Sequence, residues 1–368
     1  MEGNTEFQEP QKPPQENIKP ETQSLEAAEV GWLRGLRKRF NRVFSKEQRT
    51  EEPFPKIDID IFYSAHDTAF DMGGLEKQFE EADIYIPELF GWRKEDLDTF
   101  KKLSNGNFFV LELVEALRDK NLISSAQLRE YKIIYNSHKP IAIIDVPRNH
   151  THLDKKVRTK RHQLLIHGED NFSDILSRMK VMIKNESRAE KDREKYMISR
   201  FKQAIKEVLE EYPVFKEKNK IKVLLSLGEF HTFVYHALKR EGENVSRDFN
   251  TTMPLVFSLW AEGVRKFHFG KEAANESVAK IFLGFVFYAQ LDRSVRDLTQ
   301  DSDKVARFER KIISQFSFEE AKEIFEKLKQ GESAWQLFET KFAEKGIKIP
   351  SSEKELDEYL VKPMTKNQ

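Results

Sequence analysis

The stretch Ile57-Asp-Ile-Asp-Ile-Phe-Tyr63 decides the fold class of this chain. Its apolar and polar residues alternate, and it is rich in β-branched and aromatic side chains, so it predicts a strand. A short helical pattern over 74–82 follows, and Asp83-Ile-Tyr-Ile-Pro-Glu88 predicts a second strand. A strand, a helix and a strand in succession are typical of an α/β fold.

Further strands are predicted downstream. The apolar run Lys139-Pro-Ile-Ala-Ile-Ile-Asp145 has the character of a strand buried on both faces of a sheet. Ile221-Lys-Val-Leu-Leu-Ser-Leu227 and the short segment 244–249 complete the set. Helices are predicted between them over 94–103, 108–120, 125–136, 173–184, 187–211 and 232–240. We therefore expect a mixed or mostly parallel central sheet flanked by helices.

From Met253 onward the periodicity is helical throughout. The predicted helices are 253–267, 271–291, 302–313, 317–329, 332–344 and 353–360. We expect three parts along the chain: a tail over 1–55, an α/β domain over 56–270 and a helical C-terminal region over 271–368. The 29 Phe residues supply ample bulk for the cores of the folded parts.

Composition excludes several classes of protein. The chain of 368 residues holds 62 basic and 62 acidic residues, whereas a nucleic-acid binder shows a basic excess. No cysteine is present, so disulfides, thiolate metal sites and a cysteine nucleophile are excluded. The longest apolar stretch, Ile281 to Ala289, is too short to span a bilayer. The first six residues lack the basic and apolar regions of a secretion signal. We expect a cytoplasmic protein; its oligomeric state stays open.

The tail contains one exception to its polar, proline-rich character. Over 30–44, apolar residues recur at helical spacing and basic residues occupy the other face. Seven basic residues and one acidic residue between Arg34 and Arg49 give a local charge of +6. Such a helix suits the anionic inner surface of a membrane or an acidic groove on a partner protein. The alternative is a helix that folds back onto the main domain.

Two places in the chain put a histidine just beyond a predicted strand. His66 follows the first strand, and His231 follows the strand over 221–227 within the motif Gly228-Glu-Phe-His231. In open α/β sheets, ligands bind at this carboxyl edge. If the two units lie side by side, His66 and His231 face one another, with Glu88 and Glu229 nearby.

These four residues allow two kinds of chemistry. Two imidazoles and one or two carboxylates can bind a divalent metal such as Mn, Co or Zn and leave a position for water. Without a metal, His66, His231, Glu88 and Glu229 can supply a general base and a general acid. The alternative for His66 is a structural strand-end residue paired with Asp67.

The order of these motifs resembles the TraB/PrgY/Tiki family, which is related to the erythromycin esterases and ChaN-like proteins. The resemblance covers about residues 57–250. It rests on the two histidine motifs, on Glu81-Ala-Asp-Ile-Tyr-Ile-Pro-Glu88, and on Asp192-Arg-Glu-Lys-Tyr-Met197. It implies hydrolysis of a peptide or a small ester, with site residues at His66, Glu88, Arg193 and His231, and with Glu229 inside the second motif.

Within this resemblance, Arg193 would stabilise an oxyanion or hold a substrate carboxylate; the alternative is a residue on a solvated helix face. One departure concerns the first motif, where Tyr63 replaces the usual Gly and could fill space at the site. Asp145 either lines the same edge or caps a turn. The second hypothesis for the chain is therefore a non-catalytic binding or regulatory protein on the same fold, which docks through its N-terminal helix.

Overall fold

A computed structural model describes residues 55–64, 66, 69–119, 123–148, 170–249, 259–291, 295, 298–299 and 301–361. The chain divides into two units, Met1–Phe54 and Pro55–Gln368, and every described residue belongs to the second unit. The helix predicted over 30–44 therefore lies outside the described residues. The boundary near 270 between an α/β domain and a helical region stays a prediction.

Four parallel strands form the central sheet, in the order β2-β3-β1-β4. They are β1 (Lys56–Ser64), β2 (Ile84–Pro87), β3 (Lys220–Gly228) and β4 (Asn244–Phe249). The predicted α/β fold with flanking helices is thereby confirmed. Ser64 at the end of β1 pairs with Gly228 at the end of β3, and Pro87 at the end of β2 pairs with Ser226. The carboxyl ends of three neighbouring strands therefore meet at one edge.

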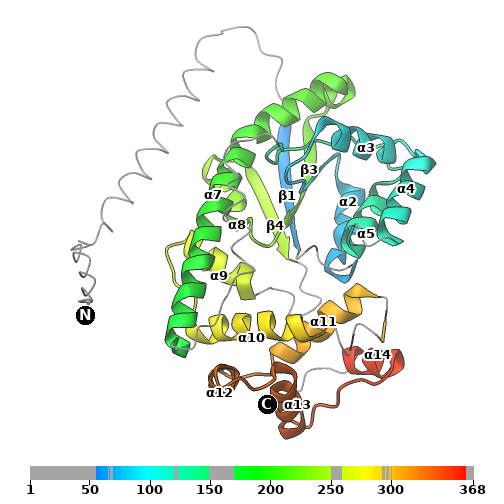
Figure 1. Ribbon diagram of the computed structural model, residues 1–368. Coiled ribbons are helices and arrows are strands. Elements are labelled where there is room, and N and C mark those ends of the chain that lie inside the picture. Colours follow the sequence, from blue (N-terminus) through cyan, green and yellow to red (C-terminus); the bar gives the residue numbers. More distant parts are fainter. Residues whose placement is uncertain are drawn as a thin grey trace, which may run out of the picture. The chain divides into compact units, whose positions relative to one another are not determined.

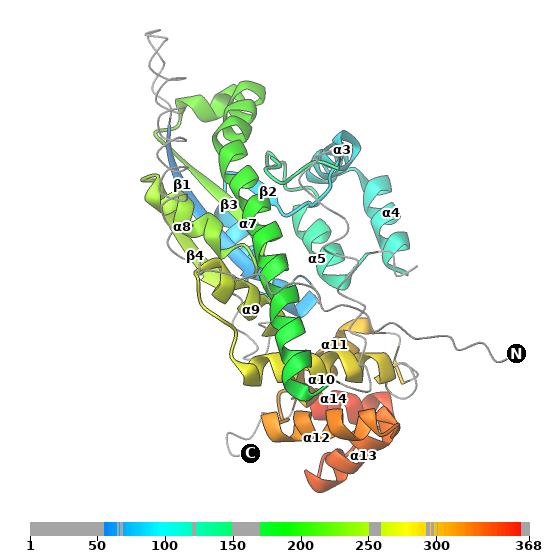
Figure 2. The same ribbon diagram turned by 60° about the vertical axis from the view of Figure 1, so that its left-hand side comes forward.

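Helices cover both faces of the sheet (Figures 1 and 2). One face carries η1 (Ala69–Met72), α2 (Leu75–Glu81), α3 (Lys94–Ser104), α4 (Phe108–Asp119) and α5 (Ser125–Ile134). The other face carries α7 (Phe172–Glu211) and α8 (Thr232–Arg240), with η3 (Pro213–Glu217) leading into β3. The alternation along β1 serves both layers, because Ile61 packs in the core beside α7 while Phe62 packs in the core beside α2.

The C-terminal part consists of helices, as predicted. They are α9 (Leu259–His268), α10 (Asn275–Leu291), α11 (Ser302–Ile313), α12 (Phe318–Lys329), α13 (Ala334–Glu344) and α14 (Glu353–Val361). Their core is rich in phenylalanine and includes Phe282, Phe325 and Phe338, all fully buried. Across the described ranges, no helix is long and apolar enough to cross a membrane.

Two predictions of secondary structure were wrong. Residues 139–145 do not form a strand: the segment makes one isolated bridge, between Ile141 and Tyr85, and the chain then runs on beside the residues that follow β2, with a second bridge between Pro147 and Trp92. The helices predicted over 173–184 and 187–211 are one continuous helix, α7. No Gly or Pro interrupts residues 172–211, and the charged residues in the middle of α7 find partners on the sheet edge, so the helix does not break there.

Candidate functional site

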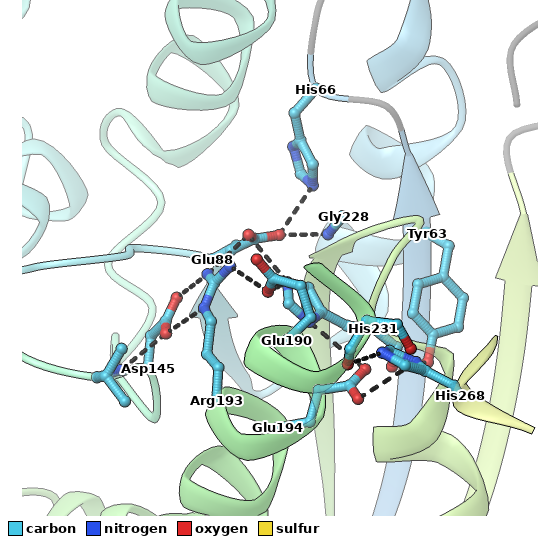
Figure 3. Close-up of polar contacts among 12 residues, drawn as sticks. Tyr63, His66, Glu88, Asp145, Glu190, Arg193, Glu194, Gly228, His231 and His268 are labelled. Atoms are coloured by element: carbon cyan, nitrogen blue, oxygen red, sulfur yellow. Dashed lines mark hydrogen bonds and ion pairs between the residues drawn. The ribbon is translucent and has the colours of Figure 1, made fainter. Parts of the chain in front are cut away.

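Three strand ends bring His66, Glu88 and His231 together (Figure 3). Glu88 directly follows β2, His66 lies two residues after β1, and His231 is the N-cap of α8 just beyond β3. The His231 Nε2 atom lies 3.1 Å from Glu88 Oε1, and the His66 Nε2 atom lies 3.8 Å from Glu88 Oε2. The parallel register places the Glu88 carboxylate between the two imidazoles.

Nitrogen donors contact both oxygens of Glu88. Arg193 Nη2 donates a hydrogen bond of 2.7 Å to Oε1, and the backbone N–H of Gly228 donates to Oε2. Burial alone would raise the pKa of Glu88, but the facing charges of His231 and Arg193 outweigh it and hold the pKa well below the usual range. The carboxylate is therefore ionised at neutral pH.

Gly228 is required for the close approach of Glu88. A Cβ atom at position 228 would lie 2.8 Å from Glu88 Oε2, which is closer than real Cβ contacts come. The glycine of the second histidine motif thus has a physical reason: it lets a backbone N–H reach the carboxylate.

Arg193 lies on the buried face of α7, not on the solvated face that its charged neighbours suggest. Its side chain is 4% exposed, and its nitrogens contact three carboxylates. Nε donates to Asp145 Oδ1 over 2.8 Å, Nη2 reaches both Asp145 and Glu88, and Nη1 donates to Glu190 over 3.2 Å. The ring of Phe90 covers the guanidinium, with its centroid 4.8 Å from the Cζ atom. Arg193 therefore fixes Glu88 and is not turned toward solvent.

His66 is the imidazole of this group that solvent reaches. Its side chain is 21% exposed, whereas that of His231 is 1% exposed. The His66 backbone has a φ of 55°, in the left-handed region that non-glycine residues rarely adopt. Strain of this kind concentrates at functional sites, so the conformation motivates a functional hypothesis.

His231 is a buried cation. Burial lowers its pKa, but the charge of Glu88 and hydrogen bonds with Glu194 and Glu88 outweigh the burial and raise the pKa to about 10. The Nδ1 atom of His231 lies 3.5 Å from Glu194 Oε1. The imidazolium thus stands between two carboxyl groups, one on each of its nitrogens.

Tyr63, which replaces the glycine of the first motif, does not point toward Glu88. Its ring is fully buried and stacks on Phe249 with 4.8 Å between the centroids. Its hydroxyl donates a hydrogen bond of 3.0 Å to the backbone carbonyl of His231. The tyrosine therefore supports the loop that carries His231.

Glu229, the remaining predicted site residue, lies beside α9. It is buried, its backbone carbonyl accepts a hydrogen bond of 3.0 Å from Arg265 Nη1, and its charge acts on the Arg265 guanidinium. The contacts described for Glu88 are with Arg193, Gly228, His231 and His66. Four of the five predicted residues thus share one network, and Glu229 occupies a different position.

Sequence reasoning missed three members of this network, Glu190, Glu194 and His268. Asp145, predicted either to line this edge or to cap a turn, does both, because it accepts from Arg193 and from the backbone N–H of Val146. A signal for two of the three missed residues was present: the apolar stripe of α7 runs through Ile183 and resumes at Met197, and Glu190 and Glu194 fall on the same face. Charged residues on a buried helix stripe indicate a polar site. His268 had no such signal.

Comparison with protein-family models, with curated proteins and with solved structures found no match to this chain.

Proposed function

We propose that this chain is a hydrolase of the TraB/Tiki-like type, which cleaves a peptide or ester bond at the carboxyl edge of its sheet. The observation that carries the proposal is the partly exposed imidazole of His66 beside Glu88. The buried charges of His231 and Arg193 keep the Glu88 carboxylate ionised. A base that solvent reaches, next to a fixed carboxylate, is suited to activating water.

In the proposed reaction, His66 is the general base. Its Nε2 atom is buried and faces Glu88, so the opposite ring nitrogen, Nδ1, takes a proton from a water molecule as the water oxygen bonds to the carbonyl carbon of the substrate. The bond to the leaving group then breaks, and the His66 imidazolium returns the proton to the leaving oxygen or nitrogen. His66 is thereby restored, and the proton count balances.

Glu88 stabilises the imidazolium that forms on His66. Their closest atoms are 3.8 Å apart, so the negative charge of Glu88 favours protonation of the ring in the transition state. Arg193 and His231 are positioning residues in this scheme, because their hydrogen bonds hold the carboxylate at one place and keep it ionised.

The donor set does not suit a divalent metal in this arrangement. Both oxygens of Glu88 already accept hydrogen bonds, and one of these comes from Nε2–H of the protonated His231. Arg193 would place a positive charge against any cation bound to Glu88. Among the described residues, no group of three or more His, Asp or Glu side chains is arranged to hold a metal ion. We therefore favour the metal-free version of the reaction.

Adding a divalent metal ion distinguishes the metal-free reaction from a metal-dependent one. Excess Mn²⁺, Co²⁺ or Zn²⁺ is expected to leave the melting temperature of the protein unchanged. A ligand at 100 times its dissociation constant would add about 2.7 kcal/mol to the free energy of unfolding. Stabilisation of that size, lost in both His66→Ala and His231→Ala, would contradict the metal-free version.

Turnover of p-nitrophenyl acetate and of a mixture of fluorogenic peptides tests the function. Replacing a general base costs about 10²- to 10⁴-fold in rate, so His66→Gln should lose hydrolysis by at least about 100-fold. The matched control is His236→Gln on α8, where the imidazole packs against the rings of Tyr235 and Phe269. If His66→Gln and His236→Gln both hydrolyse as fast as the wild type, the activity does not arise at this site.

A binding or regulatory protein on the same fold is the second candidate, because the first motif lacks its usual glycine, even though Tyr63 itself points away from Glu88. It predicts no turnover in the wild type but a rise in melting temperature with a peptide or ester. For either function we propose a cytoplasmic location. The basic segment 30–44 would contact an anionic inner membrane surface or an acidic partner.

A further inference from the structure

Glu194 occupies a position in which an ionised carboxylate would be costly. It follows Arg193 in α7, and its side chain is fully buried. Its Oε1 atom lies 3.5 Å from His231 Nδ1, and its Oε2 atom lies 3.7 Å from His268 Nδ1. Glu190 on the same helix and Tyr63 across from it are the other titratable groups whose charges act together with that of Glu194. A buried carboxyl group needs hydrogen-bond partners, and the groups around it are the two imidazoles and the backbone N–H of Phe233 in α8.

The tautomer of His268 follows from its other contact. Its Nε2 atom lies 2.8 Å from the backbone carbonyl of Ser187, and a carbonyl only accepts, so Nε2 carries the hydrogen. Burial lowers the pKa of His268 to about 4, which keeps the ring neutral. Its Nδ1 atom is then an acceptor that faces Glu194 Oε2.

The Nδ1 atom of His268 and the Oε2 atom of Glu194 are 3.7 Å apart, beyond hydrogen-bond distance, and both are buried without a hydrogen-bond partner. An acceptor nitrogen that faces a carboxyl oxygen avoids repulsion only if the carboxyl group carries the hydrogen. Burial raises the pKa of Glu194 to about 7, although His231 and the backbone N–H of Phe233 act to lower it, so the protonated form predominates below pH 7. Oε1 then faces Nδ1–H of His231 at 3.5 Å. The result is a directional series of contacts in which His268 orients Glu194 and Glu194 orients His231 (Figure 3).

The series ends at the proposed active site. With Nδ1 of His231 held by Glu194, the opposite nitrogen, Nε2, points at Glu88 Oε1 over 3.1 Å. We infer that Glu194 and His268 are positioning residues, which lock the ring of His231 in the orientation that holds Glu88 against His66. This inference rests on the proposed hydrolase function for its kinetic consequence but not for its geometry. It also gives α9, which carries His268, a part in the site.

The pair Glu194→Gln and Glu194→Leu tests the inference. A Gln side chain can accept from His231 Nδ1–H and donate an N–H to His268 Nδ1, so it reproduces both contacts of the protonated Glu. Leu reproduces neither. Loss of groups that orient a ligand or base costs about 10- to 100-fold. We expect Glu194→Leu to lose about that factor in kcat toward p-nitrophenyl acetate with little change in KM, and Glu194→Gln to stay within about 3-fold of wild type.

A spectroscopic measurement keeps the inference testable if the chain does not hydrolyse esters. In protein labelled with ¹⁵N-histidine, the ring nitrogens of His231, assigned by comparison with His231→Gln, should keep the same shifts in Glu194→Gln. They should move in Glu194→Leu and in His268→Leu, with folding checked by circular dichroism.

Two outcomes would overturn the inference. One is a Gln variant as impaired in kcat as the Leu variant, which would mean that the site needs the charge of Glu194 and not its hydrogen bonds. The other is a His231 spectrum that is the same in wild type, Glu194→Leu and His268→Leu. An inactive wild type with the expected His231 shifts would refute the hydrolase proposal and leave the positioning pair intact.

Discussion

Helix α7 passes through two regions whose buried residues differ in kind. Its first turns, including Ile175 and Met179, pack in the phenylalanine-rich core of the C-terminal helices. Its middle turns place Glu190, Arg193 and Glu194 at the sheet edge, where they are as buried as the apolar residues. One helix thus serves an apolar core and a buried ionic network.

The difference indicates that the apolar core stabilises the fold, whereas the ionic network at the sheet edge serves another purpose. Apolar burial contributes about 25 cal/mol per Å², and the close-packed rings of the C-terminal core benefit fully from it. A buried ion pair rarely stabilises more than an apolar pair of the same size, because both charges lose their hydration. A network of carboxylates and cations at a strand edge therefore points to a chemical role. The free energy of unfolding of single variants measures this contrast.

The largest loss is expected from Phe282→Ala in the C-terminal core. The ring is fully buried and contacts the rings of Phe172 and Phe325 at centroid distances of 5.8 Å and 6.0 Å. Removing it should cost about 4 kcal/mol, as is typical for Phe→Ala in a core. Urea unfolding measures this, with Phe109→Ala as the control because that side chain is 81% exposed on α4. Equal losses in the two variants would contradict the assignment of this core.

The next largest loss is expected from Arg193→Gln, which leaves Glu88, Asp145 and Glu190 buried without their common cation. Breaking a buried pair from one side costs about 3 kcal/mol or more. The control is Arg200→Gln on the same helix, whose pair with Glu207 lies at the surface, and where about 0.5 kcal/mol is expected.

Low pH should distinguish the loss of stability in Arg193→Gln from the loss in Phe282→Ala. The pKa of Glu88 is depressed in the folded protein, so the stability it contributes is present above about pH 4.3 and is lost as the pH falls further. The deficit of Arg193→Gln relative to wild type should therefore shrink in urea titrations below pH 4. The deficit of Phe282→Ala should not. A deficit of Arg193→Gln that is independent of pH would indicate lost packing and not lost charge pairing.

The apolar region could be predicted from the sequence, and the ionic network only in part. Period-2 and period-3.6 patterns identify β1 and the C-terminal helices, because each residue type there agrees with its environment. Arg193 and Glu194 break that agreement, since their charge favours a solvated face and only the register of α7 shows that they are buried. His268 reaches the site from α9, across many residues of chain, and no local pattern encodes that contact.

A smaller effect is expected from alkaline pH. The folded pKa of His231 is raised to about 10, above the value of about 6.5 for an unfolded chain. Its contribution is therefore fully present below pH 6.5 and is lost as the pH rises through about 10. At about 1.4 kcal/mol per pH unit for a full proton, wild type should lose about 2.5 kcal/mol between pH 7 and 9. His231→Gln should lose much less. Parallel curves for the two proteins would contradict a buried imidazolium.

The smallest effect on stability is expected from His66→Gly, although this variant should lose the proposed hydrolysis. His66→Gly removes the proposed general base, so hydrolysis should disappear. The same change relieves a left-handed backbone at φ 55°, which costs a non-glycine residue about 1–2 kcal/mol. Glycine also gives the unfolded chain more freedom, worth roughly 0.5–1 kcal/mol in the opposite direction.

The two terms partly cancel, so the free energy of unfolding of His66→Gly should lie between that of wild type and a value about 1.5 kcal/mol higher. His66→Ala is the matched control. It also lacks the imidazole but keeps the backbone strain, and it should be less stable than His66→Gly. A His66→Gly variant less stable than His66→Ala would mean that the left-handed backbone is not strained. The conformation of His66 would then carry no argument for function, and the hydrolase proposal would depend on the side-chain contacts of Glu88 alone.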